Sequence, residues 1–383
     1  MIENALAGNR KYWLWISALL VLIVIGALFY MRQLTYGLGV TGLSRDVTWG
    51  LYISQFTFFV GVAASAVMVV LPYYLHDYKQ FGKITILGEL LAVAAVTMCM
   101  LFIFVDMGQP ARVMNVLLHP TPHSMMFWDM VSLSGYLLLN GVVAFTTLSS
   151  DRKGVATPHW VKPFIYLSIP WAVSIHTVTA FLYSGLAARP FWMTAVLAPR
   201  FLASAFASGP ALLILLILVL RRTTGYDPGA AALGKLKTIM TYAATISVFF
   251  VLMELFTAFY SGIPEHREHF EFLYAGLDGQ SGLVPWMWVS VILMVAALSM
   301  LYSPRTRVGN QVLAASCVCI FISLWIEKGM GLIVGGLVPS ALGSVAKYQP
   351  TMPEWGIVIG IWAIGSLMVT VFYKITVGVR SIS

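Results

Sequence analysis

The chain has 383 residues, of which 59% are hydrophobic and only 10% are charged, and its formal net charge is +8. Its mean hydropathy is +0.85. Soluble domains carry about 25% charged residues, so this composition excludes an ordinary soluble protein and predicts an integral membrane protein. The positive charge requires no nucleic-acid partner, because basic cytoplasmic connections and contact with anionic membrane lipid account for it.

Long uncharged segments recur along the chain and predict ten transmembrane helices, since a bilayer is spanned by about 20 apolar residues. The segments are 13–31, 47–75, 90–105, 130–150, 163–188, 201–220, 238–253, 279–304, 308–326 and 355–373. They do not alternate polar and apolar residues, as the strands of a membrane barrel do. We therefore expect an all-α integral membrane protein, with a single polytopic membrane domain over residues 1–383.

The basic residues predict how the chain is oriented in the membrane. If the N-terminus is cytoplasmic, most Lys and Arg residues fall in the cytoplasmic connections, around residues 10, 79, 152, 221, 235 and 305. The positive-inside rule then favours both termini in the cytoplasm. In this orientation the long connections 32–46, 106–129, 189–200, 254–283 and 327–354 lie on the opposite, outer side.

Residues 99–129 carry the densest group of ionisable side chains next to apolar segments. The third apolar segment ends at Asp106, the chain then passes Arg112 and His123, and the fourth segment begins at Asp129. Ionisable groups at membrane depth are costly, which makes them functional candidates. A structural interpretation stays open, in which Asp106 and Asp129 cap helix ends or pair with Arg112.

Other ionisable residues within or beside the apolar segments extend this group. We expect Glu254, Glu327 and Lys328 at the outer ends of their helices, His176 near the middle of the fifth helix, and Glu89 near the cytoplasmic start of the third. Structural alternatives stay open for these residues as well. An ion pair at the lipid interface would also explain Glu327 and Lys328. A hydrogen bond between helices would explain His176, and a pair with Lys83 or Lys79 would explain Glu89.

The sequence offers no pattern for a haem or metal of its own. It lacks a C-x-x-C-H motif, its three cysteines form no metal-binding spacing, and the histidines other than His176 lie at segment ends or in connections. We therefore expect no haem or metal centre in this chain.

Several motifs together resemble the NrfD/PsrC family of quinone-interacting membrane subunits, and most closely its ten-span branch, which includes the DsrP and HmcC subunits. The motifs are TGLSRDVTWGLYISQFTFFVGVAASAVM (41–68), DMGQPARVMNVLLHPTPHSMMFWD (106–129), SIHTVTAFLYSGLAARPFWMTAVLAPRFLASAFASGPALL (174–213), ELFTAFYSGIPEH (254–266) and LVPWMW (283–288). The chain departs from the family pattern at Gln109, where the family often has arginine.

The resemblance implies a fold and a role. The family folds as two four-helix bundles with extra helices at the edges, in the cytoplasmic membrane of bacteria or archaea. Its members bind quinone, either menaquinone or ubiquinone, near the periplasmic face. They exchange electrons there with a ferredoxin-like iron–sulfur subunit, and subunits of cytochrome c or cytochrome b type are further expected partners. The resemblance therefore implies the quinone-reactive part of a respiratory oxidoreductase complex, which is not active alone.

Quinone chemistry requires hydrogen-bond donors for two carbonyl oxygens and carriers for two protons. We expect Asp106 and His176 to act in catalysis. The remaining predicted quinone-binding residues are Trp49, Arg112, His123, Tyr183 and Tyr260, and the predicted proton path comprises Glu89, Asp129, Glu254 and Glu327. An aromatic belt at the lipid interface is an open alternative for the aromatic residues.

The outer connection after the seventh helix is a candidate docking surface. It carries Glu265, Glu268, Glu271 and Asp278, although a solvated loop also explains this charge. Two other functions stay open for the whole chain, a secondary transporter and a purely structural membrane anchor. A transporter would place its polar site at broken helices near the membrane midplane, and an anchor would bind no quinone.

Overall fold

The computed structural model describes residue 3 and residues 7–76, 78–303 and 309–380. Among these residues the regular structure is helical, apart from an isolated bridge between Leu277 and Gln280. Ten helical segments of the described chain are long and apolar enough to cross a membrane. The prediction of an all-α membrane protein with ten spans is thus confirmed.

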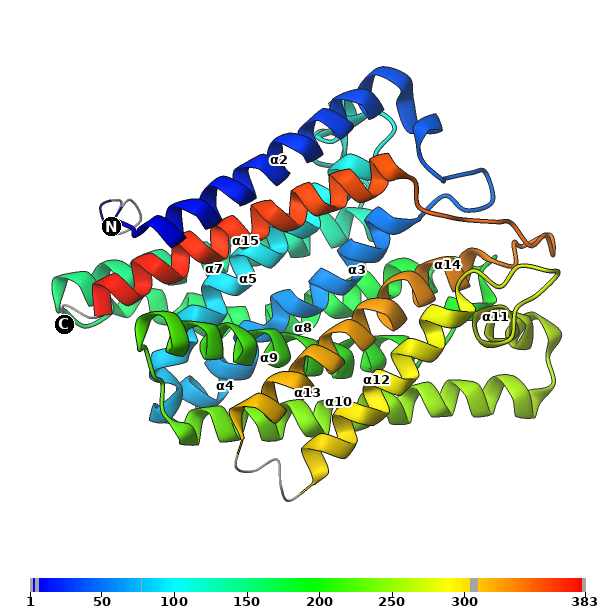
Figure 1. Cartoon of the computed structure of the whole chain (residues 1–383). Coiled ribbons are helices and arrows are strands. Elements are labelled where there is room, and N and C mark those ends of the chain that lie inside the picture. The colour runs from blue at the N-terminus through cyan, green and yellow to red at the C-terminus, as the bar shows by residue number, and fades with distance from the viewer. Residues whose placement is uncertain (1–2, 4–6, 77, 304–308, 381–383) are drawn as a thin grey trace.

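The spans alternate in direction along the chain (Figure 1). The first five are α2 (Arg10–Tyr36) with η1 (Gly37–Val40), α3 (Leu51–Ala63) with η2 (Ala64–Ala66) and α4 (Val67–Leu75), η3 (Lys79–Phe81) with α5 (Gly82–Asp106), α7 (Met125–Lys153), and η5 (His159–Val161) with α8 (Lys162–Ser184). The last five are α9 (Leu197–Thr224), α10 (Ala230–Ser261), α12 (Val284–Tyr302), α13 (Asn310–Leu324) with η8 (Trp325–Gly331) and α14 (Leu332–Leu337), and α15 (Met352–Arg380).

Both ends of the described chain lie on one face, which we call the terminal face (Figure 1). The opposite face, the long-loop face, carries the connections 41–50, 107–124, 185–196, 262–283 and 338–351, with the short helices η4 (Pro110–Arg112), α6 (Asn115–Leu118), η6 (Pro190–Trp192) and α11 (Pro264–Tyr274). The basic connection around residue 305, which contributed to the orientation prediction, lies outside the described residues. Which face is cytoplasmic stays a prediction.

The first and last spans pack against each other at the edge of the molecule (Figure 1). They approach so closely that a Cβ atom on Gly26 would lie 2.7 Å from the Cα atom of Gly360. Every residue of α3 is buried, and this helix packs against α5, α8, α9 and η8. Because α3 contacts spans from both the first and the second half of the chain, it forms the centre of the molecule. The division into two four-helix bundles stays a prediction.

Two spans are interrupted inside the membrane. The second span changes to a 3₁₀ turn at Ala64–Ala66, and the ninth contains a π-helical turn at Trp325–Gly331. In contrast, α8 and α9 continue as helices through Pro170 and Pro210. A π turn contains an extra residue and changes the directions of its side chains, which is why such turns are frequent at functional sites. Here the turn contains Glu327 and Lys328.

Candidate functional site

Polar side chains from three helices meet at the long-loop ends of α2 and α5. Gln33 of α2 is 3% exposed. Its amide nitrogen donates to the Val105 carbonyl oxygen at 2.6 Å, and its amide oxygen accepts from the Tyr52 hydroxyl at 2.7 Å. The next residue after Val105 is Asp106, whose Oδ1 atom is buried and has no hydrogen-bond partner among the described residues. The Tyr30 hydroxyl of α2 is buried and unpartnered in the same way.

A cavity of about 310 Å³ lies beside these groups. It is bounded by Tyr30, Gln33 and Leu34 of α2, by residues 37–38, and by the segment 107–111, which follows Asp106 directly. Its walls combine apolar side chains with a nearly equal share of polar atoms, and its volume lies at the lower end of the roughly 300–1,000 Å³ of binding sites for organic ligands. Gln109, which departs from the family pattern, is one of the lining residues.

A second group, of aromatic residues, lies on the same side of the membrane. The Trp49 ring packs edge-on against Tyr183, with 5.7 Å between centroids, and lies 6.0 Å from the Trp192 ring. The hydroxyls of Tyr183 and Thr57 form a hydrogen bond of 2.5 Å. Trp192, which no sequence pattern singles out, is buried and donates to the Leu332 carbonyl oxygen at 2.9 Å. Trp49 and Tyr183 thus belong to a packed aromatic cluster inside the protein.

His176 and Asp129 lie deeper, between α7 and α8. His176 is fully buried, and its Nδ1 atom lies 3.1 Å from the Ala172 carbonyl oxygen. A carbonyl oxygen only accepts hydrogen bonds, so Nδ1 carries the proton. The Nε2 atom has no hydrogen-bond partner among the described residues and can therefore accept a proton. Asp129 is buried and accepts a hydrogen bond of 2.6 Å from the Thr179 hydroxyl. The hydrogen bond of His176 is within its own helix rather than between helices.

A buried ionic cluster joins α9, α10 and the π turn. Arg200 binds the carboxylates of Glu254 and Glu327 with its two terminal nitrogens. Lys328 is 4% exposed, lies 4.3 Å from the centre of the Phe201 ring and donates to the Phe201 carbonyl oxygen at 3.4 Å. A buried arginine that binds two carboxylates satisfies charges that would otherwise be very unfavourable in the membrane.

This cluster corrects the predicted positions of three residues. Glu327 and Lys328 do not lie at the end of the ninth span, which continues to Leu337, and neither side chain reaches the lipid interface. Glu254 lies two turns before the end of α10. The prediction was wrong because it ended each helix at its first charged residue. Arg200 was not among the predicted site residues. It directly precedes the apolar segment 201–220, and other apolar segments contain acids without a partner, so its position could have indicated an ion pair.

Three predicted quinone-site residues lie apart from these groups. Arg112 and His123 are exposed in the connection 107–124. Tyr260 is 81% exposed and stacks on Phe256 with 5.0 Å between ring centroids. None of the three lines the cavity beside Asp106.

At the terminal face, Glu89 is 2% exposed and its Oε2 atom has no hydrogen-bond partner in the described part of the chain. Closer to that face, Arg380 binds Asp151 at 3.0 Å and donates to the Lys83 carbonyl oxygen at 2.9 Å. Glu89 lies within electrostatic range of both Arg380 and Asp151. The interpretation of Glu89 as a lipid-facing partner of Lys83 is therefore wrong, because Glu89 is inside the protein and Lys83 is exposed.

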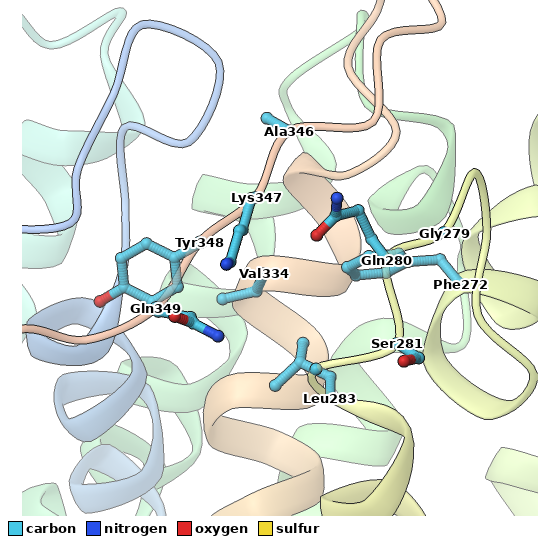
Figure 2. Close-up of a pocket in the computed structure, with 11 residues that line it drawn as sticks. Phe272, Gly279, Gln280, Ser281, Leu283, Val334, Ala346, Lys347, Tyr348 and Gln349 are labelled. Atoms are coloured by element: carbon cyan, nitrogen blue, oxygen red, sulfur yellow. The ribbon is translucent and has the colours of Figure 1, made fainter.

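A second cavity, of about 240 Å³, opens on the long-loop face (Figure 2). It lies between residues 279–283 and 346–349, above Val334, and the Lys347 ammonium group points into it (Figure 2). Tyr348 also lines the cavity, but its hydroxyl points away: it accepts from the Leu51 amide at 2.7 Å and donates to Glu354 at 2.6 Å. Burial and the nearby Glu354 carboxylate raise the pKa of Tyr348, so the phenol stays protonated and keeps this role.

No group of three or more His, Cys, Asp or Glu side chains in the described residues is arranged to hold a metal ion. The structure does bring together the predicted residues Trp49 and Tyr183, and it buries Asp106, Asp129, His176, Glu89, Glu254 and Glu327 at several depths. The candidate site thus has an outer part, the cavity beside Asp106, and an inner part of buried ionisable groups.

Comparisons with known proteins agree with this architecture. The family model described as polysulphide reductase, NrfD, matches residues 39–338. A protein of Halobacterium salinarum, provisionally named as a membrane subunit of dimethyl sulfoxide reductase, is 27% identical over 93% of this chain and 89% of its own length.

Two further relatives match nearly the whole chain. A protein of Mesobacillus selenatarsenatis that is named as a subunit of selenate reductase is 24% identical, over 94% of this chain and 95% of its own length. The Hdr-like menaquinol oxidoreductase integral membrane subunit of Archaeoglobus fulgidus is 22% identical, over 94% and 93%. Since the family model covers more than half of the chain, the protein belongs to the NrfD polysulphide reductase family.

Proposed function

We propose that this chain is the quinone-reactive membrane subunit of a respiratory redox complex. The observation that carries the proposal is a cavity of about 310 Å³ whose lining segment 107–111 directly follows Asp106, a residue with a buried Oδ1 atom that has no partner among the described residues. The names of the relatives support it, because they are subunits of reductase complexes and one is named for menaquinol. That name also favours menaquinone over ubiquinone.

The residues around the cavity fit a quinone head group. The apolar side chains of the wall suit the ring, and in our proposal the Tyr30 phenol and the Asp106 carboxyl, which precedes the lining segment, supply the hydrogen-bonding positions that two ring oxygens need. A bound quinone or quinol supplies the exchange of two electrons and two protons. In our proposal Asp106 holds one proton at Oδ1 next to the ligand, and the buried setting keeps water from competing for it. The Trp49–Tyr183 cluster stabilises the adjacent end of α3.

His176 has a separate part in this proposal. Its Nε2 atom is an unused acceptor, which can take a proton and pass it to a neighbouring carboxylate. Asp129, held by Thr179, is on the adjacent helix. We propose that Glu89 receives protons at the terminal face, that His176 and Asp129 relay them, and that Glu254 with Glu327 forms a further proton-holding unit.

We further propose the orientation and the partners. Both termini face the cytoplasm of a bacterium or archaeon, as the basic residues favour, so the cavity beside Asp106 lies near the periplasmic face. A ferredoxin-like iron–sulfur subunit docks on the long-loop face, and subunits of cytochrome c or cytochrome b type complete the complex. Acidic α11 and the cavity that contains Lys347 are available to contact such an iron–sulfur partner.

The proposal can be tested with the purified complex that contains this chain. Asp106→Asn should leave the complex assembled but lower both its bound quinone and its quinol-linked turnover, the latter by about tenfold or more, as for loss of a proton-transferring group. Asp46→Asn, a partly exposed carboxyl in the connection 41–50 of the same face and outside the proposed docking surface, is the matched control. If purified wild-type complex binds no quinone, the structural-anchor alternative replaces the proposal.

A secondary transporter is the second candidate, and two observations favour keeping it. The second and ninth spans are broken, and the break at Trp325–Gly331 carries a buried ionic cluster, as transporters with midplane sites have. Flux of a solute through vesicles that contain only this chain, without a redox partner, would support this candidate. Redox-dependent proton movement without solute flux would support the quinone-reactive function.

A further inference from the structure

We propose that the first transmembrane helix, α2, completes the quinone-binding cavity, with Tyr30 as a ligand-binding residue and Gln33 as a positioning residue. This inference rests on the proposed function. The family model begins at residue 39, so α2 lies before the matched residues and its contribution to a site does not follow from family membership. It follows instead from how α2 packs at the end of α5.

The cavity-lining residues of α2 occupy one face of the helix. Gln33 and Leu34 follow Tyr30 by three and four positions, which places the three side chains on the same side of the helix. Most of the rest of α2 is exposed and apolar, as expected for a helix in contact with lipid. A buried glutamine in such a helix is unfavourable unless its amide group forms hydrogen bonds. Gln33 therefore indicates that this face of α2 has a specific structural or functional role.

Gln33 fixes the geometry of the cavity wall. Its amide nitrogen holds the Val105 carbonyl, one residue before Asp106, and its amide oxygen holds the hydroxyl of Tyr52. A single side chain of α2 therefore joins α3 to the end of α5. Because Gln33 uses its amide on protein atoms, it acts on a ligand through the position of Asp106.

Tyr30 has the opposite character. Tyr30 is one of the residues that line the cavity, and its hydroxyl is buried and has no partner among the described residues, so a hydrogen bond is available there. An unpartnered buried hydroxyl is unfavourable, and a ligand oxygen would supply the missing hydrogen-bond partner. The ring of Tyr30 packs against Phe104 with 5.9 Å between centroids, which fixes its direction.

The charge of the lining residues indicates which type of ligand the cavity binds. No Lys, Arg, Asp or Glu is among the lining residues, although Asp106 directly precedes the lining segment 107–111 and Arg112 directly follows it. An anionic phospholipid head group would require cations at these positions. A neutral ring with two oxygens fits the walls better. Leu34 lines the cavity and is 52% exposed, so the cavity borders the lipid-facing surface from which a membrane-soluble quinone would enter.

The test compares two tyrosines of the same helix. Tyr30→Phe removes the proposed ligand contact, and Tyr36→Phe is the matched control, because Tyr36 is 71% exposed and does not line the cavity. Each variant is purified in the full complex, and the dissociation constant of a short-tailed naphthoquinone is measured by fluorescence titration. We expect Tyr30→Phe to weaken binding by about tenfold, as for one lost hydrogen bond, with no change for Tyr36→Phe.

Gln33→Leu tests the positioning role. It should lower quinol turnover more than it weakens naphthoquinone binding, because the ring contacts remain while Asp106 loses its fixed position. A photoreactive azido-naphthoquinone provides an activity-independent measurement, with the labelled peptides identified by mass spectrometry. We expect label on residues 30–38 and 107–111, and less label in Tyr30→Phe.

The outcomes separate this inference from the proposed function. If Tyr30→Phe and Tyr36→Phe bind alike while Asp106→Asn loses binding, the inference is wrong and the proposed function stands. Label on other helices, or a phospholipid that naphthoquinone does not displace from the cavity, would also overturn the inference. If the wild-type complex takes up neither ligand nor label, the proposed function itself fails.

Discussion

Glu327 and Lys328 are consecutive in the chain, yet their side chains bind in different surroundings. Glu327 binds Arg200, whereas Lys328 lies against the ring and carbonyl oxygen of Phe201. The π-helical turn that contains both residues allows this separation. With Arg200 protonated and both carboxylates ionised, Arg200, Glu254 and Glu327 together carry one excess negative charge, which the Lys328 ammonium group would balance. The ionic cluster thus comprises four residues, although Lys328 has no carboxylate of its own.

Arg200 should be essential for assembly. Arg200→Met would leave the carboxylates of Glu254 and Glu327 buried without a partner, which destabilises a protein by about 3–5 kcal/mol. We expect a large loss of folded protein and a lower unfolding temperature in detergent. Arg267→Met is the control, because the Arg267–Glu271 pair is largely exposed and such pairs contribute within about 1 kcal/mol. Equal stability of the two variants would contradict the assigned role of Arg200.

The fold was predictable from the sequence to a larger extent than the site. Ten apolar segments of the right length determine ten spans, because a bilayer allows few alternatives to helices. The site depends on contacts between residues far apart in the chain, such as Gln33 with Val105 and Arg200 with Glu327. Periodicity and charge do not identify such pairs.

Individual residues show why the site was harder to predict than the fold. Tyr260 and His123 have suitable chemistry and lie near the predicted face, but their side chains point away from the protein interior. Trp192, Tyr30 and Gln33 were not selected, since an aromatic or a single amide in an apolar segment is common. Their importance appears only once the packing of α2 and of the connection 185–196 is known.

The attachment of α11 should depend on pH. His269 is buried, its Nδ1 atom lies 2.7 Å from the Gly335 carbonyl oxygen and 3.0 Å from that of Val338, and burial lowers its pKa below the ordinary value of about 6.5. The unfolded segment therefore binds a proton at a higher pH than the folded one. The stability that His269 contributes is complete above about pH 6.5 and falls as the pH decreases below that value.

This dependence can be followed by hydrogen exchange of the amides in residues 264–274. We expect faster exchange as the pH falls below about 6.5, after correction for the intrinsic rate. His269→Asn keeps a donor for the two carbonyls but does not titrate in this range, so its corrected exchange should be nearly independent of pH. His123→Asn, at an exposed position, serves as the control. An unchanged pH dependence in His269→Asn would assign the effect to another group.

Glu89 should be required for proton uptake at the terminal face. Glu89→Gln keeps the size of the side chain but removes its ability to exchange a proton. In vesicles that contain the full complex, we expect quinone binding to be retained and proton uptake per electron to fall about twofold or more. Glu3→Gln, a carboxyl at the same face whose position is exposed, is the control. Unchanged uptake in Glu89→Gln would exclude Glu89 from the proton path.

Lys328 should be required for turnover and should matter less for stability than Arg200. Lys328→Met removes a desolvated ammonium group that binds no carboxylate directly, so we expect a smaller loss of folded protein and a smaller decrease in unfolding temperature than for Arg200→Met. The variant leaves the Arg200 cluster with an excess negative charge and removes the cation within electrostatic range of His176. We therefore expect quinol-linked turnover to fall by about tenfold or more, because proton transfer depends on the local field.

Charge balance provides a sharper test of Lys328 than the single variant. In Lys328→Met/Glu327→Gln, Arg200 faces only the carboxylate of Glu254, and the buried cluster is neutral again. If Lys328 acts as the balancing charge, this double variant should recover a large part of the turnover that Lys328→Met loses. Glu327→Gln alone leaves the cluster with one excess positive charge and should be impaired. If the double variant is as inactive as Lys328→Met, Lys328 does not act through charge balance, and a direct exchange of its own proton would explain the loss.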